Sequence, residues 1–413
     1  LANRMKRIIA LDKPLLMGAD ENRFAAALRY HDRDLEEELR LIEATRSQMG
    51  KILATLADET WTRTGIHSER GELTLLRMLE LATRHITHHV QFIDEKRILV
   101  TGANGFAACH LLERLLASAP GHSVVAVTRG GAWPRGFEAL AGRVRLLHAE
   151  LTDAPAVQAL LAATAPEQIY HLAGFTDPVR GLRQPELAWS ANLTASRVLY
   201  EALVKLELRP RVVHVSSGAV YGDPPDPSQL ITESTVLRPN NPYAASKAAA
   251  DLLAFQCFRS WGLPIVRARP FNHIGPGLAP RFALANWAAQ VAAIERGRQP
   301  PELRVGNLDP ERDHLDVRDV VDGYVALMER GLPGEAYNLA MGQWFTMRAW
   351  LDELLKLSRS TIQVQVDPAL MRRVETATVR VDVSRIKAAA GWPPRYSLPA
   401  MLGGMLDYYR SLD

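Results

Sequence analysis

The chain has 413 residues, enough for two or three domains, and its 49 basic and 46 acidic side chains leave a net charge of +3. Hydrophobic residues make up 47% and charged residues 23%, as in globular proteins, and so balanced a charge argues against a nucleic-acid or acidic-membrane partner. Two distant cysteines, Cys109 and Cys257, form neither a disulfide framework nor a metal cluster. We find no secretory signal or bilayer-spanning apolar run, and therefore expect a cytoplasmic protein.

The first region, residues 1–94, is predicted to be an all-α segment. Charged and apolar residues recur at helical spacing in Asp32–Asp58, where Asp32 or Asp34 can cap the first turn, and again in Leu73–Ile93. The intervening stretch TWTRTGIHSERGE has the Gly, Thr and Ser typical of a turn, which predicts a loop.

The pattern changes from Lys96 onward, where short β-rich segments alternate with helical patterns. The predicted strands are KRILVTG, SVVAVTR, VRLLHAEL, EQIYHLAG, RVVHVSS and PIVRARPFN. This alternation predicts an α/β fold with a Rossmann-type doubly wound parallel sheet. We expect residues 95–265 mainly to bind a cofactor and residues 266–413 to form a smaller α/β substrate-binding part. The join at 94–96 contains no flexible linker, so we expect the two regions to pack together.

A glycine-containing turn follows the first strand of this series, in VTGANGFAA. Gly102 permits a tight turn, and Gly105 lets the backbone approach a pyrophosphate at a helix N-terminus. Ala108 stands where the usual pattern has a third glycine for close helix–strand packing. Such glycines are common in ordinary turns, but their place after the first strand of a βαβ series favours a dinucleotide site that includes Asn104 and Phe106.

The ends of the next strands are expected to line the same cofactor. NAD sites usually place an acidic residue after the second strand to bind the ribose 2′-hydroxyl, and this chain has no acid there. Arg129 follows that strand instead. It is either a solvated surface residue or a partner for a 2′-phosphate, which would favour NADP(H) over NAD(H). Asp153 follows the third strand near the expected adenine position. Leu172 and Ala173, in HLAG, follow the fourth strand.

The predicted catalytic groups follow the fifth strand and open a helix. Tyr243 and Lys247, in NPYAASK, are four residues apart and therefore share a helix face. A phenol with a pKa near ~10 is a poor catalyst at neutral pH, and a cation one turn away is expected to lower that pKa. Ser217, at the end of VSS, can hold the substrate oxygen, because parallel sheets place active sites at the carboxyl ends of their strands.

The motifs TGANGF, HLAG, VSSGAVYG, YAASK and RPFNHIGPG resemble those of the extended short-chain dehydrogenase/reductase family, from residue 97 to about 277. The resemblance implies a nicotinamide cofactor, a nucleotide-sugar substrate, a homodimer and a catalytic trio of Ser217, Tyr243 and Lys247. It also implies that Asn272 contacts the sugar nucleotide.

The C-terminal half resembles the GDP-sugar branch of that family, through RFALANWAAQ, GNLDPERD and RRVE. Arg281 and Arg312 are expected to bind the substrate, and the fork of Arg312 can grip a pyrophosphate. Arg372 and Glu375 are three residues apart, and Glu375 can accept bonds from guanine or ribose; the alternative for each is a surface ion pair.

Position 219 separates two enzyme types within this branch. GDP-mannose 4,6-dehydratases carry a Glu two residues before the tyrosine of the YG pair, where this chain has Ala219. Alanine cannot move a proton, so elimination loses its catalyst, whereas reduction of a ketone needs no such group. We therefore expect reduction of the 4-keto group of a GDP-4-keto-6-deoxy-hexose, giving GDP-D-rhamnose. A nucleotide-sugar epimerase, which also lacks that Glu, is the alternative, as is a dehydratase-like enzyme.

The N-terminal region resembles the last part of a DinB-type helical bundle, through RTGIHSERGELTL and TRHITHHVQFIDE. His85 and His89, beside His88, have the spacing of two metal ligands on one helix face. A third ligand would have to be His31 or His67, the latter in the predicted loop, so an ordinary histidine cluster is favoured over a metal site. Three alternatives remain for this segment: an inert bundle, a metal-binding module of a bifunctional protein, or an oligomerisation module.

Overall fold

A computed structural model describes residues 2–17, 34–68, 71–83, 96–118, 121–224, 226, 229–371 and 379–412. The chain divides into two compact units, Leu1–Asp94 and Glu95–Asp413. Among the described residues, none of the helices is both long and apolar enough to cross a membrane.

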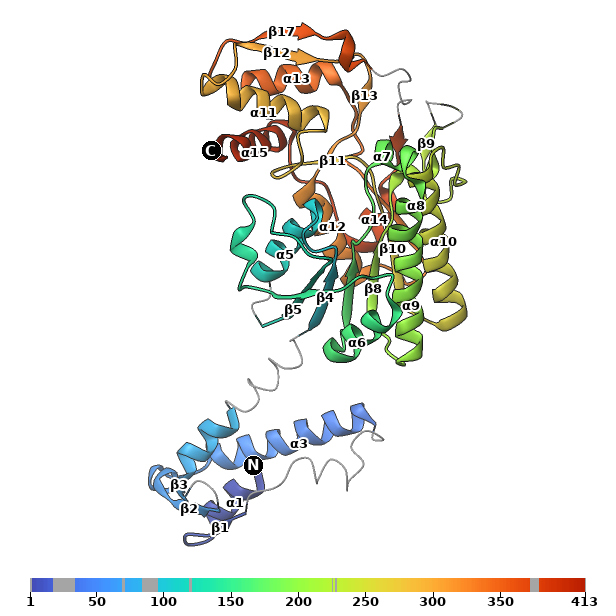
Figure 1. The fold of residues 1–413 in the computed structure, drawn as a ribbon. Coiled ribbons are helices and arrows are strands. Elements are labelled where there is room, and N and C mark those ends of the chain that lie inside the picture. The colour runs from blue at the N-terminus through green and yellow to red at the C-terminus, as the bar shows by residue number, and fades with distance from the viewer. Residues whose placement is uncertain are drawn as a thin grey trace. The chain divides into compact units, whose positions relative to one another are not determined.

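The N-terminal unit combines helices with a small sheet. Its helices are α1 (Ala2–Ala10), α3 (Leu35–Ala54) and residues 75–83. The strands β1 (Leu15–Leu16), β2 (Thr64–His67) and β3 (Gly71–Thr74) form a sheet in that order (Figure 1). Helix α3 lies within the helix predicted for Asp32–Asp58, and residues 75–83 are the described helical part of the one predicted for Leu73–Ile93, but the all-α expectation is wrong for the stretch between them. In place of the expected loop, that stretch contains the antiparallel strands β2 and β3, and β2 is further stabilised by pairing with β1, in which Leu15 is the partner of Ile66, 51 residues later (66 − 15).

Helix α3 begins where its cap permits. Of the two candidates, Asp34 is the cap: its carboxylate accepts a hydrogen bond from the Glu37 amide at 2.9 Å. Three acidic residues in the first turn also favour the helix start. The core beneath this unit consists of Met5, Ile8, Leu16, Met49, Leu75 and Met78.

The second unit is built on a seven-stranded sheet in which every neighbouring pair is parallel. Its order is β15-β10-β8-β7-β4-β5-β6. The strands are β4 (Arg97–Thr101), β5 (Ser123–Thr128), β6 (Arg145–His148), β7 (Gln168–His171), β8 (Arg211–Val215), β10 (Ile265–Pro270) and β15 (Ala336–Leu339). The first six are the predicted strands, and the doubly wound Rossmann-type fold is confirmed.

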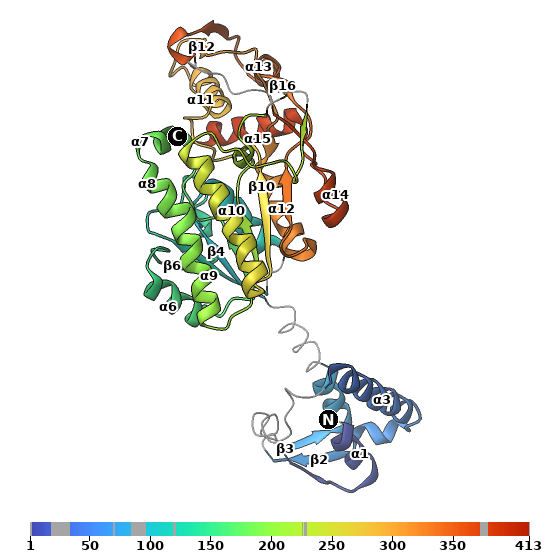
Figure 2. The ribbon, with the colours of Figure 1, turned by 90° about the vertical axis from the view of Figure 1, so that its right-hand side faces the viewer.

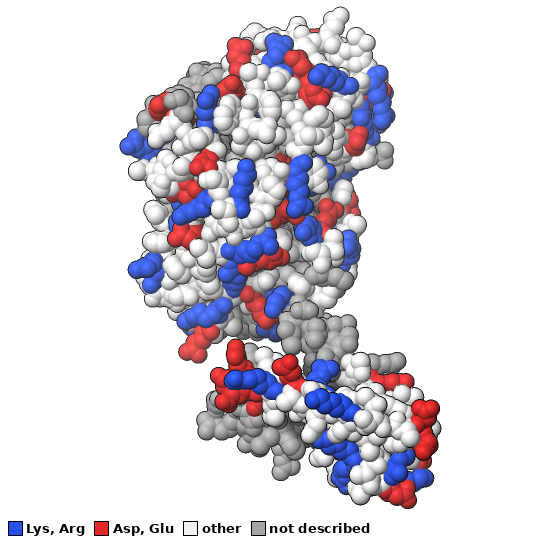
Figure 3. Space-filling model, turned by 180° about the vertical axis from the view of Figure 1, so that it is seen from behind, with Lys and Arg blue, Asp and Glu red and all other residues white. Residues whose placement is uncertain are grey.

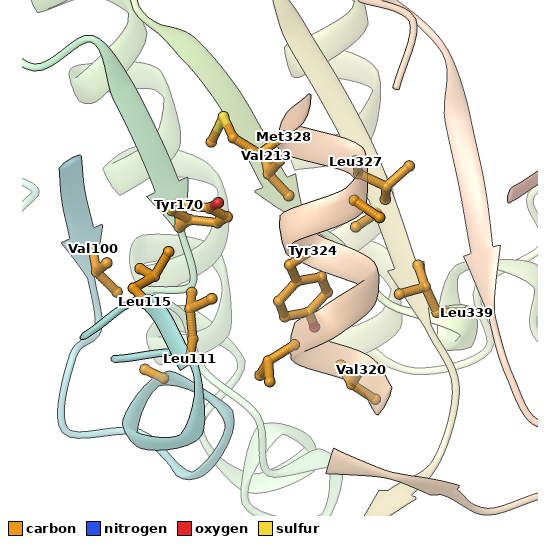
Figure 4. Packing of buried hydrophobic residues seen from close by; sticks show 14 of the residues in the cluster. Val100, Leu111, Leu115, Tyr170, Val213, Val320, Tyr324, Leu327, Met328 and Leu339 are labelled. Atoms are coloured by element: carbon orange, nitrogen blue, oxygen red, sulfur yellow. The ribbon is translucent and has the colours of Figure 1, made fainter. Parts of the chain in front are cut away.

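Helices cover both faces of the sheet (Figures 1 and 2). On one face lie α6 (Ala154–Thr164), α9 (Ala195–Lys205) and α10 (Pro242–Trp261), and on the other lie α5 (Phe106–Ser118) and α12 (Val317–Arg330). Figure 4 shows side chains of α5 and α12 meeting those of the sheet, with Tyr170 and Tyr324 both fully buried between them. The resulting apolar layers hold the carboxyl ends of the strands in fixed positions.

The remaining part has its own core of three helices beside a two-stranded sheet. Helices α11 (Ala283–Glu295), α13 (Met347–Lys356) and α15 (Leu398–Ser411) pack near β12 (Glu302–Val305) and β17 (Gln363–Val366). Short strand pairs join it to the large sheet: β11 (His273–Ile274) with β14 (Leu315–Asp316), β13 (Glu311–Arg312) with β16 (Phe345–Thr346), and β9 (Leu230–Ile231) with β18 (Arg380–Val381). Helix α14 (Ser384–Ala390) and the short helices α7 (Pro178–Arg183) and α8 (Pro185–Ala188) complete the fold.

Candidate active site

The turn after β4 is shaped so that only glycine fits at its first position. Gly102 has φ +69°, and a β-carbon there would lie 2.7 Å from the Cα and 2.8 Å from the amide nitrogen of Ala173. The Gly105 amide donates to the Gly102 carbonyl at 2.9 Å, and α5 begins at Phe106. Ala108 is buried at the helix–strand contact. This close backbone approach at a helix N-terminus fits a dinucleotide pyrophosphate.

Three of the other predicted cofactor residues, Asn104, Arg129 and Asp153, differ in their surroundings. Asn104 donates through Nδ2 to the Gly130 carbonyl at 3.1 Å, which ties the turn to the loop after β5. Arg129 stands at the start of that loop and is exposed. Asp153 caps α6, accepting from the Ala156 amide at 3.2 Å, so one of its oxygens has a structural role. The structure thus brings Gly102, Asn104 and the loop of Arg129 together.

The predicted catalytic trio meets at the carboxyl end of β8. Asn241 caps α10 by accepting from the Ala244 amide at 2.9 Å, which starts the helix just before Tyr243. Lys247 is buried, and its Nζ donates to the Val215 carbonyl at 2.9 Å. Ser217 follows that strand, and its hydroxyl shares a hydrogen bond with the Tyr243 phenol.

The electrostatics of the trio differ from the sequence expectation. Burial raises the pKa of the Tyr243 phenol above its ordinary value, and the hydrogen bond with Ser217 lowers it only in part. Burial lowers the pKa of Lys247 from 10.5 to about 8, against the opposing effect of Asp251. The prediction that Lys247 lowers the pKa of Tyr243 is therefore wrong for this state, in which the ammonium bonds a backbone carbonyl. A phenol with a raised pKa stays protonated at neutral pH and is suited to donate a proton.

A buried ion cluster supports α10 one turn beyond Lys247. The Asp251 carboxylate is fully buried and contacts Arg267 at 2.7 Å and Arg269 at 2.7 Å. Burial alone would raise the pKa of Asp251, but the charge-assisted bonds from the two arginines outweigh it and hold that pKa at about 2. Because both arginines lie on β10, the cluster fixes the catalytic helix to the sheet.

Asn192 is a site residue that the sequence analysis missed. It lies in a π-helical turn, Trp189–Thr194, a local geometry that often marks functional positions. Its Nδ2 donates to the Ser246 hydroxyl at 2.9 Å, and its Oδ1 accepts from the Phe175 amide at 2.8 Å. Ser246 in turn donates to the Tyr243 carbonyl at 2.8 Å. Asn192 therefore orients the first turn of α10, and no spacing in the sequence marks it.

Position 219 lies beside the trio. Ala219 is in the short turn Gly218–Tyr221, and its amide donates to the Ser217 hydroxyl at 3.1 Å. The neighbouring Tyr221 phenol donates to Asn338 at 2.7 Å and accepts from Arg269 at 2.8 Å, so it is held away in the buried cluster. The side chain at position 219 thus brings no proton donor or acceptor to the site.

The predicted substrate residues are placed only in part. Asn272 is exposed after β10, and Arg281 is exposed and lies over the Phe282 ring at 4.8 Å. Arg312 is half-buried in β13, where its Nη1 donates to the Glu311 carbonyl at 2.7 Å. Arg372 and Glu375 lie outside the described residues. The roles of these residues in substrate binding therefore stay predictions.

The metal candidates of the N-terminal unit are mostly outside the described residues, namely His85, His88, His89 and His31. His67 is described and buried in β2, so its prediction as a loop residue is wrong, because the hairpin incorporates it. Across the described ranges, no three His, Cys, Asp or Glu side chains group as metal ligands.

Comparisons with known proteins agree with this architecture. Residues 99–405 match the family model described as GDP-mannose 4,6 dehydratase, and residues 3–93 match the DinB superfamily. GDP-6-deoxy-D-mannose reductase from Pseudomonas aeruginosa is 33% identical over 317 residues, 76% of this chain and 98% of that protein. Among solved structures, RMD from Pseudomonas aeruginosa complexed with NADPH matches with a TM-score of 0.68 and 30% identity, over 77% of this chain and 98% of that one. UDP-glucose 4-epimerase from Thermus thermophilus, complexed with NAD, matches with a TM-score of 0.67 and 26% identity, over 76% and 99%.

Proposed function

Because the chain belongs to the GDP-mannose 4,6 dehydratase family of nicotinamide-dependent nucleotide-sugar enzymes, we propose that it reduces the 4-keto group of a GDP-4-keto-6-deoxy-hexose and forms GDP-D-rhamnose. The observation that carries this proposal is the trio at the end of β8 with an alanine beside it. Ser217 and Tyr243 share a hydrogen bond, Lys247 bonds the Val215 carbonyl two residues before Ser217, and Ala219 provides no group for elimination.

The side chains divide the reaction between them. A reduced nicotinamide, when bound, supplies hydride to the carbonyl carbon. Ser217 donates a hydrogen bond to the carbonyl oxygen and polarises it. Tyr243 gives its proton to the same oxygen, and its raised pKa keeps that proton in place until transfer. The Lys247 ammonium then stabilises the phenolate that remains.

A spectrophotometric assay tests this function. Enzymatically made GDP-4-keto-6-deoxymannose and NADPH or NADH are mixed with the protein, and loss of nicotinamide absorbance is followed. We expect turnover with the ketosugar and no 4-keto-6-deoxy sugar from GDP-mannose alone. Formation of that ketosugar from GDP-mannose would show that elimination proceeds without an acid at position 219 and would overturn the proposal.

An epimerase is the second candidate, because it needs the same trio and also lacks the acid at position 219. It would act with retained NAD, as the epimerase relative in its NAD complex suggests. Interconversion of UDP-sugars without net consumption of nicotinamide would identify it.

We propose NADP(H) as the preferred cofactor. Arg129 is exposed at the carboxyl end of β5, and no acid takes its place to bind a ribose 2′-hydroxyl. Arg129→Ala is expected to raise the KM for NADPH by about tenfold and to leave the KM for NADH within about twofold. Equal effects on both cofactors would assign Arg129 to the solvated surface.

We also propose that the second unit forms a homodimer through α7 and α10. Large apolar side chains are exposed on these helices: Val179 (67%), Leu182 (65%), Leu252 (56%) and Phe255 (41%). Elsewhere, as on the face in Figure 3, basic and acidic side chains are interspersed. Helices α7 and α10 are in contact, and exposed apolar side chains on adjoining helices favour an association surface. Leu252→Glu is expected to halve the mass in solution, whereas a wild-type monomer would contradict this interface.

A further inference from the structure

Two adjacent tyrosines on α15 bond two different loops of the nucleotide-binding region. The Tyr408 hydroxyl donates to the Arg135 carbonyl at 2.9 Å, and the Tyr409 hydroxyl donates to the Leu278 carbonyl at 2.5 Å. Consecutive side chains on a helix point about 100° apart, so neighbours can reach separate segments. We name Tyr408 and Tyr409 the tyrosine pair.

The first loop, residues 129–137, follows β5 and begins with Arg129. Near its start, the Gly130 carbonyl accepts a hydrogen bond at 3.1 Å from Asn104, in the turn after β4. Near its end, Gly136 has φ +85°, and a β-carbon there would lie 3.0 Å from the Tyr408 ring. The loop is therefore held at one end by the turn after β4 and at the other by α15.

The second loop, residues 271–278, follows β10, contains the two-residue strand β11 and carries Asn272. His110 of α5 donates through Nε2 to the Pro276 carbonyl at 2.8 Å, and a β-carbon at Gly277 would lie 2.8 Å from the Phe137 ring. The second loop thus packs against the end of the first. It ends at Leu278, the residue that Tyr409 bonds.

Helix α15 can transmit a displacement between these loops. Its residues Met401, Leu402, Met405 and Leu406 are fully buried in the core with α11 and α13. A close-packed helix of this kind moves with its core instead of deforming. A shift of either loop therefore reaches the other through one rigid body.

We propose that the tyrosine pair couples cofactor binding to nucleotide-sugar binding. This inference rests on the proposed function, and on the predictions that Arg129 of the first loop contacts the cofactor and Asn272 of the second loop contacts the nucleotide sugar. Tyr408 and Tyr409 are positioning residues: they bond the loops, and the loops contact the ligands. When the bound cofactor orders the first loop, the second loop is ordered with it, so the nucleotide sugar binds at a smaller entropic cost. Each ligand therefore lowers the Kd of the other by the same factor.

Equilibrium titrations of the full chain test the coupling. The Kd for NADPH is measured without and with saturating GDP, and the Kd for GDP is measured without and with NADPH. We expect GDP to tighten NADPH binding roughly fivefold or more in the wild type, with a reciprocal effect on GDP. In Tyr408→Phe the factor is expected to fall below about twofold, and the Kd for NADPH alone to rise about threefold to tenfold, the effect of one lost hydrogen bond.

Two further variants separate coupling from general damage. Tyr409→Phe is expected to lower the coupling factor and leave the Kd for NADPH alone within about twofold, since its loop carries no cofactor residue. Tyr396→Phe, just before the start of α15 with its ring under Arg318, is the matched control and should retain wild-type values. Wild-type coupling in both Tyr408→Phe and Tyr409→Phe would refute the inference, as would GDP binding that leaves the NADPH affinity of the wild type unchanged. Failure of GDP to bind would instead refute the proposed substrate class, and the coupling with it.

Discussion

Replacing Gly102 by alanine probes the turn that the cofactor site depends on. The new methyl group would lie 2.7 Å from the Ala173 Cα, whereas ordinary contacts begin at 3.4 Å, so the backbone must yield by 0.7 Å (3.4 − 2.7). Ala173 resists this shift because its amide donates to the Thr101 hydroxyl at 3.2 Å. Overpacking of this kind costs about 1–3 kcal/mol, and the left-handed backbone adds about 1–2 kcal/mol for a residue with a β-carbon.

The expected loss of unfolding free energy is therefore about 2–5 kcal/mol, measured by urea denaturation. A displaced turn should also raise the Kd for NADPH at least tenfold, or about 1.4 kcal/mol, by titration. Gly142→Ala is the matched control: Gly142 has φ +79°, but nothing lies within 4 Å of the position that its new methyl group would take. It should show the backbone cost alone and wild-type cofactor affinity. If the two variants behave alike, the close approach at Gly102 does not constrain the site.

Three further perturbations address the trio and its support. Tyr243→Phe should lower kcat by about 10²–10⁴-fold with cofactor affinity retained, and wild-type turnover would remove the phenol from the mechanism. Lys247, with its pKa lowered to about 8, loses its proton as the pH rises through that value, so kcat should fall between about pH 7 and 9; a flat profile would show that the ammonium is not needed. Asp251→Asn leaves two buried guanidinium groups uncompensated and should lower the unfolding free energy by about 3–5 kcal/mol. The control Glu201→Gln breaks an exposed ion pair with Arg197 and should lower the unfolding free energy by less than about 1 kcal/mol. Equal losses in the two variants would contradict a supporting role for the buried cluster.

The regular part of the fold was predictable because short β-rich segments alternate with helical patterns along the chain. The six predicted strands all take their places in the parallel sheet. The seventh, β15, was missed, since its four residues AYNL include a buried asparagine and show no alternation. It is stabilised by pairing with β10 and by the bond from Tyr221 to Asn338, and both interactions join distant segments. The hairpin of the N-terminal unit was missed for the same reason.

The candidate site divides in the same way. Gly102, Ser217, Tyr243 and Lys247 could be named because strand ends and helix spacing carry information about position. The pKa of Tyr243 could not be predicted, because it depends on burial and on the hydrogen bond with Ser217. Asn192 depends on a π-helical turn that aligns it with Ser246, 54 residues later in the chain.

Isotope transfer tests the central claim most directly. The protein is incubated with GDP-4-keto-6-deoxymannose and NADPH that carries deuterium on the transferable position of its nicotinamide ring. Our account predicts that the product hexose gains a single deuterium at C4 and that Tyr243→Phe forms almost none of this product. A product without deuterium at C4, or no consumption of the ketosugar by the wild type, would contradict it.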